Sequence, residues 1–262
     1  MPARSAATRL DRGRAWVVVP ARDEERLIGR CLAALGEQRG VPPHAFGVLL
    51  VLDRCIDATE ARARAAGAAA GVRLGVLHAR GPGPGAARRT GMDRAGADLL
   101  ARDRPGGLIA CTDADSAVAP DWLAAQFEAV RRGARAIGGR VELWPGVEAA
   151  LPEPVRRWRA ADARRRHARV LAQRVDREAV EHWQFSGASL AVTAETYARV
   201  GGIEPCDVLE DEAFERRLRR HGVPIERLSA VRVRTSARLD GRAPRGLAND
   251  LASAWGRAAL AA

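Results

Sequence analysis

Short apolar runs alternate with longer amphipathic segments through the first 115 residues. The segments between the runs show the helical spacing of apolar or small residues, and the runs lie at 15–19, 47–52, 74–77 and 108–113. Strict alternation of strand and helix favours parallel strands joined by right-handed crossover helices. The sequence therefore predicts an α/β fold of Rossmann-like type, with a mostly parallel central sheet and helices on both faces.

The fourth apolar run ends at two acidic residues, Asp113 and Asp115, which stand one residue apart. Ligands of open α/β sheets bind just beyond the carboxyl ends of the strands. Two carboxylates at that edge offer hard oxygen ligands to a divalent cation and leave coordination positions for phosphate oxygens. The same residues are also typical turn formers ahead of the helix that Pro120 and Asp121 introduce. This segment alone leaves both interpretations open.

The chain is strongly basic, and all of its basic residues are arginine. It has 262 residues, 43 Arg, no Lys, a formal net charge of +11 and a pI near 11.1. Such a charge fits nucleic acid, an anionic membrane surface or a polyphosphate-bearing substrate, and arginine suits bidentate phosphate contact. A nucleic-acid surface of this kind would interleave aromatic and basic side chains. Because the chain has only four Phe and one Tyr, we expect no nucleic-acid partner.

The cysteines and the hydropathy pattern indicate a compartment. The four cysteines lie far apart and form no CxxC pair, which argues against a zinc site or a disulfide framework and fits a reducing environment. No run reaches the roughly 18 apolar residues of a membrane span, and the N-terminus lacks the apolar core of a signal peptide. We therefore expect a cytoplasmic protein without a transmembrane segment, for which peripheral membrane contact stays open.

The remaining elements follow from local signals. Asp23, Glu24 and Glu25 open the first helical pattern, where acidic residues suit the helix dipole. The second half is less regular, and its expected helices are at 122–130, 147–180, 193–200 and 209–222, with strands at 136–143 and 225–233 and a small-residue strand or turn at 186–192. The Arg-rich part of 147–180 is interpreted first as a solvated helix face.

Several motifs occur on these elements in a characteristic order. They are Val-Val-Val-Pro-Ala-Arg-Asp-Glu at 17–24, Asp53 after the second strand, Ala-Ala-Arg-Arg at 86–89, Asp-Ala-Asp at 113–115, Phe-Ser-Gly-Ala-Ser at 185–189 and Leu-Glu-Asp-Glu at 209–212. Over residues 15–240 the chain resembles the family-2 nucleotide-sugar glycosyltransferases of the GT-A fold. The resemblance implies one domain at 15–240, with a nucleotide-binding half (15–116) and an acceptor-binding half (117–240), between a flexible tail (1–14) and a helical tail (241–262).

The resemblance implies donor-binding roles for the residues that match these motifs. The nucleoside would lie against Pro20, Ala21, Arg22 and Glu24, and its base against Asp53. Base or phosphates would also be reached by Arg88 or Arg89, and Arg238 would contact the diphosphate. Gly187 would allow the backbone to approach the donor sugar or the acceptor.

The resemblance also implies the metal ligands and the catalytic residues. Asp113, with Ala114, would contact the ribose or a metal ion, and Asp115 would bind Mn²⁺ or Mg²⁺. Asp211 would be the general base, because an inverting transfer needs a group to accept the proton of the acceptor hydroxyl. Glu210 is the second candidate for that role.

The departures from the family pattern refine the expected reaction. Asp23-Glu24 stands where the family often has Asn-Glu, and the Gln-x-x-Arg-Trp signature of processive synthases is absent. We therefore expect an enzyme that adds one sugar to a small or lipid-linked hydroxyl acceptor, with a UDP-sugar favoured as donor and a GDP-sugar as the other choice. The alternatives are a sugar-phosphate nucleotidyltransferase, whose Gly-rich phosphate loop after the first strand is missing, and an Arg-rich nucleic-acid-binding protein.

Overall fold

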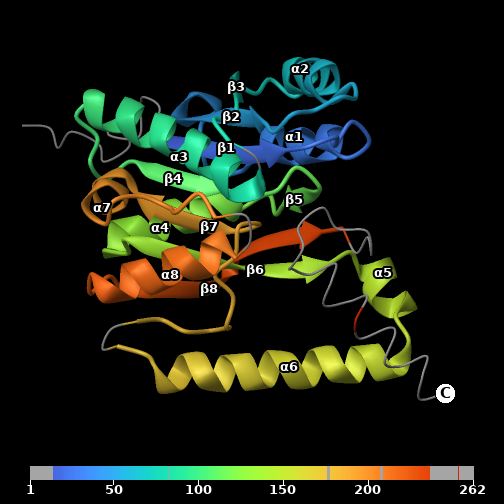
Figure 1. Ribbon diagram of the computed structural model, residues 1–262, viewed down its shortest axis with the longest axis vertical. Coiled ribbons are helices and arrows are strands. Elements are labelled where there is room, and N and C mark those ends of the chain that lie inside the picture. The colour runs from blue at the N-terminus through green and yellow to red at the C-terminus, as the bar shows by residue number, and fades with distance from the viewer. Residues whose placement is uncertain (1–13, 82, 176–177, 207–208, 237–252, 254–262) are drawn as a thin grey trace, which may run out of the picture.

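The strands form one mixed sheet (Figure 1). The computed structural model describes residues 14–81, 83–175, 178–206, 209–236 and 253. Among these residues the strand order is β3-β2-β1-β4-β7-β6-β8-β5, and β1 to β4 are mutually parallel, as are β6 and β8. β7 runs antiparallel between β4 and β6, and β5 runs antiparallel to β8. The strands are β1 (Ala15–Ala21), β2 (Phe46–Leu52), β3 (Leu74–His78), β4 (Leu108–Cys111), β5 (Ser116–Val118), β6 (Ala136–Leu143), β7 (Leu190–Thr193) and β8 (Ile225–Thr235).

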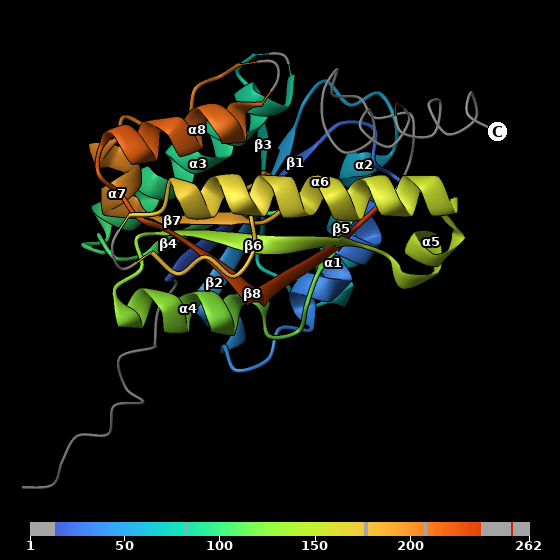
Figure 2. The same cartoon turned by 90° about the horizontal axis from the view of Figure 1, so that it is seen from below.

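Helices cover both faces of this sheet, which confirms the predicted fold class (Figure 2). On one face lie α1 (Ile28–Gly36), α2 (Thr59–Ala69) and α4 (Trp122–Arg132), and on the other α3 (Gly83–Ala101), α7 (Ala194–Arg199) and α8 (Glu210–Arg220). Successive side chains of a strand point to opposite faces, so Val17 and Val19 join the core beside α1 whereas Val18 packs beneath α3. Coverage of both faces explains why these strands are apolar throughout rather than alternating.

The first helix begins later than its acidic residues suggest. The expected helical start at Asp23, Glu24 and Glu25 is wrong, because α1 begins at Ile28 and Asp23 has a left-handed φ of 50°, which a right-handed helix does not accommodate. These residues instead fasten the loop after β1 to the loop after β2. Asp23 Oδ1 accepts the Ile56 N–H at 2.8 Å, and the Glu24 N–H donates to Thr59 Oγ1 at 2.7 Å.

The expected helix at 147–180 is two helices, α5 (Pro145–Ala150) and α6 (Glu153–Ala172). They are separated at Leu151, which is extended with a ψ of 140°, because the following Pro152 disfavours helical backbone in the residue before it. After α6 the chain runs along the outer edge of β8, where the Arg227 N–H donates to Ala179 O at 2.7 Å. As a result α6 forms a separate layer beyond that edge (Figures 1 and 2).

Short elements escaped prediction, and the chain ends lie outside the described part. The three-residue strand β5 and a 3-10 helix, η2 (Pro43–Ala45), are too short to leave a periodic pattern. The expected tails at 1–14 and 241–262, except Arg14 and Ser253, lie outside the described residues, as does Arg238. No helix in the described part of the chain is both long and apolar enough to cross a membrane.

Candidate active site

The loops that follow β1, β2 and β4 meet at one edge of the sheet. These strands are parallel and adjacent in the order β2-β1-β4, so their carboxyl ends lie together. Residues 22–24 follow β1, Asp53 follows β2, and residues 113–115 follow β4. The sheet thus gathers three segments that the sequence singled out, although they lie up to about ninety residues apart in the chain.

A buried arginine of α3 joins this edge to α8. The Arg88 side chain donates to Asp113 Oδ1 at 3.0 Å, to Glu210 Oε1 at 3.1 Å and to Gly187 O at 2.9 Å. Burial lowers the pKa of the guanidinium, but the charges of Asp113 and Glu210 outweigh it, so the pKa of Arg88 lies above its ordinary value. Four candidate residues from separate segments therefore form one cluster, here called the Arg88 cluster (Arg88, Asp113, Gly187 and Glu210).

Asp211 lies beside the Arg88 cluster in the first turn of α8. Its Oδ2 accepts the Gly187 N–H at 3.0 Å and its Oδ1 accepts the Glu212 N–H at 2.8 Å. The residue before the helix, Leu209, has a φ of 55°, an uncommon conformation for a side chain of this kind that is often found at functional sites. Burial, and next the charge of Glu210, raises the pKa of Asp211 to about 6. A half-buried carboxylate with this pKa is suited to act as a general base near neutral pH.

Asp115 precedes β5 and contacts both β5 and β8. Its Oδ1 accepts hydrogen bonds from Ser116 Oγ at 3.3 Å and from Thr235 Oγ1 at 3.4 Å. The Cys31 thiol of α1 lies beside this turn and donates to Asp113 O at 3.6 Å. Burial, followed by the charges of Asp115 and Asp113, raises the pKa of the Cys31 thiol. Asp113 and Asp115 therefore belong to one turn, here called the corner of the site, against which this buried thiol packs.

The donor atoms at this corner fit a hard divalent cation. Asp113 and Asp115 offer carboxylate oxygens, and the Asp113 side chain is 37% exposed. Two carboxylates that leave further positions for phosphate and water match the coordination habits of Mg²⁺ and Mn²⁺. Among the described residues a second group of potential ligands is formed by Asp23, Cys55 and Asp57. That group fits less well, because a thiol is a soft ligand and its carboxylates already hold the two loops together.

The residues assigned to the nucleoside lie at the same edge. Pro20 and Ala21 end β1, Arg22 is exposed, and Glu24 is buried. Asp53 is buried, and its carboxylate accepts the Gly83 N–H at 3.0 Å and the Arg54 Nε–H at 2.9 Å. Asp53 therefore also holds the Gly-rich start of α3, a role that its position after a strand did not reveal.

The two adjacent arginines of α3 point to different partners. Arg88 enters the cluster, whereas Arg89 Nη1 donates to Ile203 O at 3.0 Å and its Nε pairs with Asp93 at 3.4 Å. Neighbours on a helix are rotated by about 100°, so only one of them can face the carboxylates.

Sequence reasoning missed some of the polar partners of the site. Cys31 gave no signal beyond its helical spacing, and the support of Asp115 by Ser116 and Thr235 depends on the pairing of β5 with β8. His182, which precedes the Phe-Ser-Gly-Ala-Ser motif, is buried, and the ring of Trp183 stacks with the Arg166 guanidinium at 4.8 Å.

Replacing Gly187 with Ala should disrupt the Arg88 cluster. A Cβ at this position would lie 2.2 Å from Arg88 Nη2, and three hydrogen bonds hold that guanidinium in place. We expect a loss of about 1–3 kcal/mol in the free energy of unfolding. Urea denaturation measures it, with Gly146→Ala as the matched control because a Cβ there meets nothing within 4 Å. Equal stability of the two variants would contradict the described packing.

Solved structures share this fold. S. aureus TarS 1–349, in complex with UDP-GlcNAc, matches at a TM-score of 0.63 and 16% identity over 88% of this chain and 60% of that one. The mannosyltransferase PcManGT from Pyrobaculum calidifontis, in complex with GDP-Man and Mn²⁺, matches at a TM-score of 0.62 and 18% identity over 96% of this chain and 76% of that one. The glucosyl-3-phosphoglycerate synthase of Mycobacterium tuberculosis, in complex with Mn²⁺, UDP and phosphoglyceric acid, matches at a TM-score of 0.57 and 18% identity over 98% of this chain and 84% of that one. At these identities the likeness shows the fold alone.

The sequence comparisons define the family. No curated protein matches this chain. The family model described as glycosyltransferase like family 2 matches residues 13–249, which include the whole sheet and every candidate residue of the site. The chain therefore belongs to the glycosyltransferase-like family 2.

Proposed function

We propose that this chain is an inverting glycosyltransferase that moves one sugar from a nucleotide-diphosphate sugar to a hydroxyl acceptor. The observation that carries the proposal is the Arg88 cluster, which brings Asp113 at the strand edge together with Glu210 and Gly187, beside Asp211. The end with Asp113 suits the diphosphate of the donor, and the end with Asp211 suits removal of the proton from the acceptor hydroxyl. The family match favours this reaction over the nucleotidyltransferase and the nucleic-acid-binding alternatives.

The donor would lie along the edge formed by the loops after β1, β2 and β4. Asp53, Glu24 and the end of β1 would contact the nucleoside, and Arg88 would counter the charge gathered around Asp113. Asp113 and Asp115 would hold Mn²⁺ or Mg²⁺, which when bound would stabilise the negative charge of the departing diphosphate. A UDP-sugar is the favoured donor and a GDP-sugar the second, in line with the UDP-GlcNAc and GDP-Man complexes of the structural neighbours.

Asp211 would accept the proton of the acceptor hydroxyl as its oxygen bonds to the anomeric carbon. The bond from that carbon to the phosphate oxygen breaks in the same step, and the nucleoside diphosphate leaves with the electron pair. Each Asp211 oxygen accepts one backbone hydrogen bond and retains a second lone pair for the proton. The Gly187 N–H therefore orients the carboxylate without preventing its reaction.

For the acceptor we propose only a chemical class. Residues 117–240 would bind a small or lipid-linked hydroxyl compound, and residues 15–116 the nucleotide. We also propose a cytoplasmic location. All four cysteines are free thiols, which supports this location because stable disulfides are rare in that compartment.

The rate of transfer should depend on the ionisation of Asp211. Its pKa is raised to about 6, and only the ionised carboxylate accepts a proton, so kcat/KM should be level above neutral pH. Below pH 6 it should fall about tenfold per pH unit. A pH profile at saturating metal measures this, with thermal unfolding across the same range as the control for folding. A flat profile down to pH 5 would contradict the assignment.

The reaction itself is tested by incubating the full chain with UDP- and GDP-sugars, Mn²⁺ and hydroxyl acceptors of both classes. We expect release of the nucleoside diphosphate, and NMR of the product should show the anomeric configuration opposite to that of the donor. Retention of configuration would overturn inversion, and absence of both transfer and donor hydrolysis with every donor would overturn the proposed function.

A further inference from the structure

One side of helix α6 is exposed to solvent. Of its 20 residues ten are exposed, nine are half-buried and only Val155 is buried, and α6 lies outermost on the β8 side of the described chain (Figures 1 and 2). A helix that is polar over most of its surface gains little from packing and is marginal alone in water. A partner that covers its outer face would supply the missing stabilisation.

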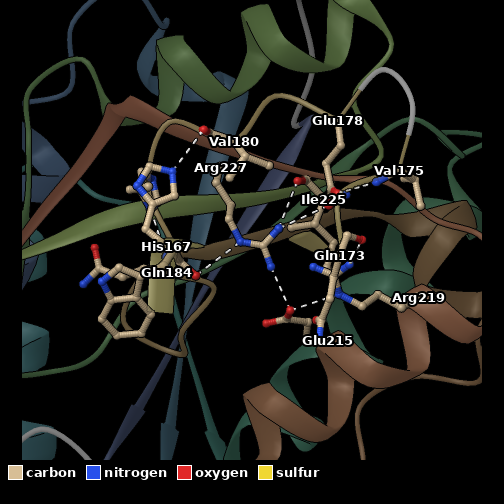
Figure 3. Close-up of polar contacts among 12 residues, drawn as sticks. His167, Gln173, Val175, Glu178, Val180, Gln184, Glu215, Arg219, Ile225 and Arg227 are labelled. Atoms are coloured by element: carbon tan, nitrogen blue, oxygen red, sulfur yellow. Dashed lines mark hydrogen bonds and ion pairs between the residues drawn. The ribbon is translucent and has the colours of Figure 1, made fainter. Parts of the chain in front are cut away.

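A buried ion-pair cluster fixes the far end of α6. Arg227 of β8 is fully buried and donates to Glu178 Oε1 at 3.2 Å and to Glu215 Oε1 at 2.8 Å. Glu178 in turn accepts the Val175 N–H at 3.3 Å, and His167 Nε2 lies 3.4 Å from Val180 O (Figure 3). These contacts tether the C-terminal half of α6 and the segment after it to β8 and α8.

The outer face carries arginine and apolar side chains on one stripe. A stripe of exposed residues with helical spacing is formed by Arg157, Ala160, Arg164, Ala168 and Leu171, and exposed Arg165 and Arg169 flank it. Exposed Val175 follows the helix end, and Leu171 and Val175 are two of the four exposed large hydrophobic residues of the described chain. Arginine and apolar groups thus share one side of α6 and its C-terminal end.

Part of the positive charge of α6 and its C-terminal end has no acidic partner among the described residues. Residues 153–175 hold eight Arg and two acids, and each acid already pairs with two arginines, Glu153 with Arg156 and Arg157 and Asp162 with Arg165 and Arg166. Exposed Arg164, Arg169 and Arg174 make no ion pair with other described residues. These three arginines are therefore available to an anionic partner.

We propose that the outer face of α6 docks on an anionic phospholipid bilayer. Interfacial helices lie in the membrane plane, with basic side chains at the headgroups and apolar ones in the acyl boundary, which matches arginines beside Leu171 and Val175. A nucleic acid fits less well, because single-strand binding depends on bases stacking on aromatic side chains, and no aromatic side chain is among the exposed large hydrophobics of the described residues. This docking is separate from glycosyl transfer, and it would place a transferase at a surface where lipid-linked hydroxyls occur.

Vesicle flotation of the full chain tests the proposal. The protein should float with phosphatidylcholine vesicles that contain phosphatidylglycerol, not with phosphatidylcholine alone, and high salt should release it. Arg164→Gln with Arg169→Gln should weaken binding roughly tenfold or more, since each basic residue near such a surface raises the affinity by a factor of about five. Leu171→Ser with Val175→Ser should weaken it by a comparable amount.

The matched control is Arg62→Gln with Arg94→Gln. It removes the same charge from exposed positions of α2 and α3, at the opposite end of the molecule in Figure 1, and should leave vesicle binding unchanged. Three results would each overturn the proposal. The first is equal weakening by this control, and the second is no binding to anionic vesicles. The third is DNA binding that depends on Arg164 and Arg169, together with vesicle binding that does not depend on Leu171 and Val175. Donor hydrolysis, measured in parallel, should be unchanged in the α6 variants; its absence in the wild type would count against the proposed function and not against docking.

Discussion

Replacing Asp211 with Asn should lower transfer by about three orders of magnitude and leave donor binding intact. A positioned general base contributes about 10²–10⁴-fold, and the amide cannot accept the acceptor proton. The fold should tolerate the change, because the ionised carboxylate is disfavoured by burial and by Glu210, so a neutral group relieves that cost while it gives up one backbone hydrogen bond. The measurement is kcat at saturating donor, with donor affinity from thermal shift.

The matched control for this variant is Glu212→Gln. Glu212 is the next residue of α8, is exposed and pairs only loosely with Arg216 at 3.8 Å, so its loss should leave kcat within a factor of about two because exposed pairs contribute little. If Asp211→Asn lost donor binding as well as transfer, Asp211 would belong to the donor site and Glu210 would become the candidate base.

Replacing Asp115 with Asn should abolish metal-dependent binding of the donor. A metal that neutralises a leaving group contributes several kcal/mol, which corresponds to a loss of about three orders of magnitude or more in kcat/KM. The amide oxygen can still accept hydrogen bonds from Ser116 and Thr235, so the fold should persist. The assay is kcat/KM titrated with Mn²⁺, in which the variant should have lost its response to the ion.

Asp121→Asn is the matched control for the metal assignment. Asp121 is close in sequence, its side chain is 55% exposed and it pairs with Arg232 at 3.6 Å, outside the corner that Asp113 and Asp115 share. It should retain the Mn²⁺ response of the wild type. An Asp115→Asn enzyme with full Mn²⁺-dependent activity would remove Asp115 from the metal site.

The sequence predicted β1 to β4 well because each of these strands carries its own signal. Both faces of β1 and β4 are covered, so their residues form unbroken apolar runs, and the edge at which parallel strands end then locates Asp53 and Asp113. The break at Pro152 also had a signal, since proline restricts the residue before it, but the helical composition on both sides hid it. By contrast, the left-handed backbone of Asp23 is a response to contacts with the next loop.

The finer structure of the site depends on distant contacts. The choice between Arg88 and Arg89 depends on the rotation of α3, whose glycine-rich start has no apolar periodicity. The contact of Asp53 with Gly83 spans 30 residues and that of Arg88 with Glu210 spans 122. Such pairs follow from the packed fold, and local pattern cannot reveal them.

The most direct test is a thermal-shift comparison of the wild type, Asp115→Asn and Asp211→Asn with UDP- and GDP-sugars, with and without Mn²⁺. A ligand that binds the native state raises Tm by mass action. We predict that one nucleotide sugar raises Tm of the wild type and of Asp211→Asn only with Mn²⁺, and fails to do so for Asp115→Asn. A donor-dependent rise that is the same in Asp115→Asn, or no rise with any donor, would contradict a donor site at this edge of the sheet.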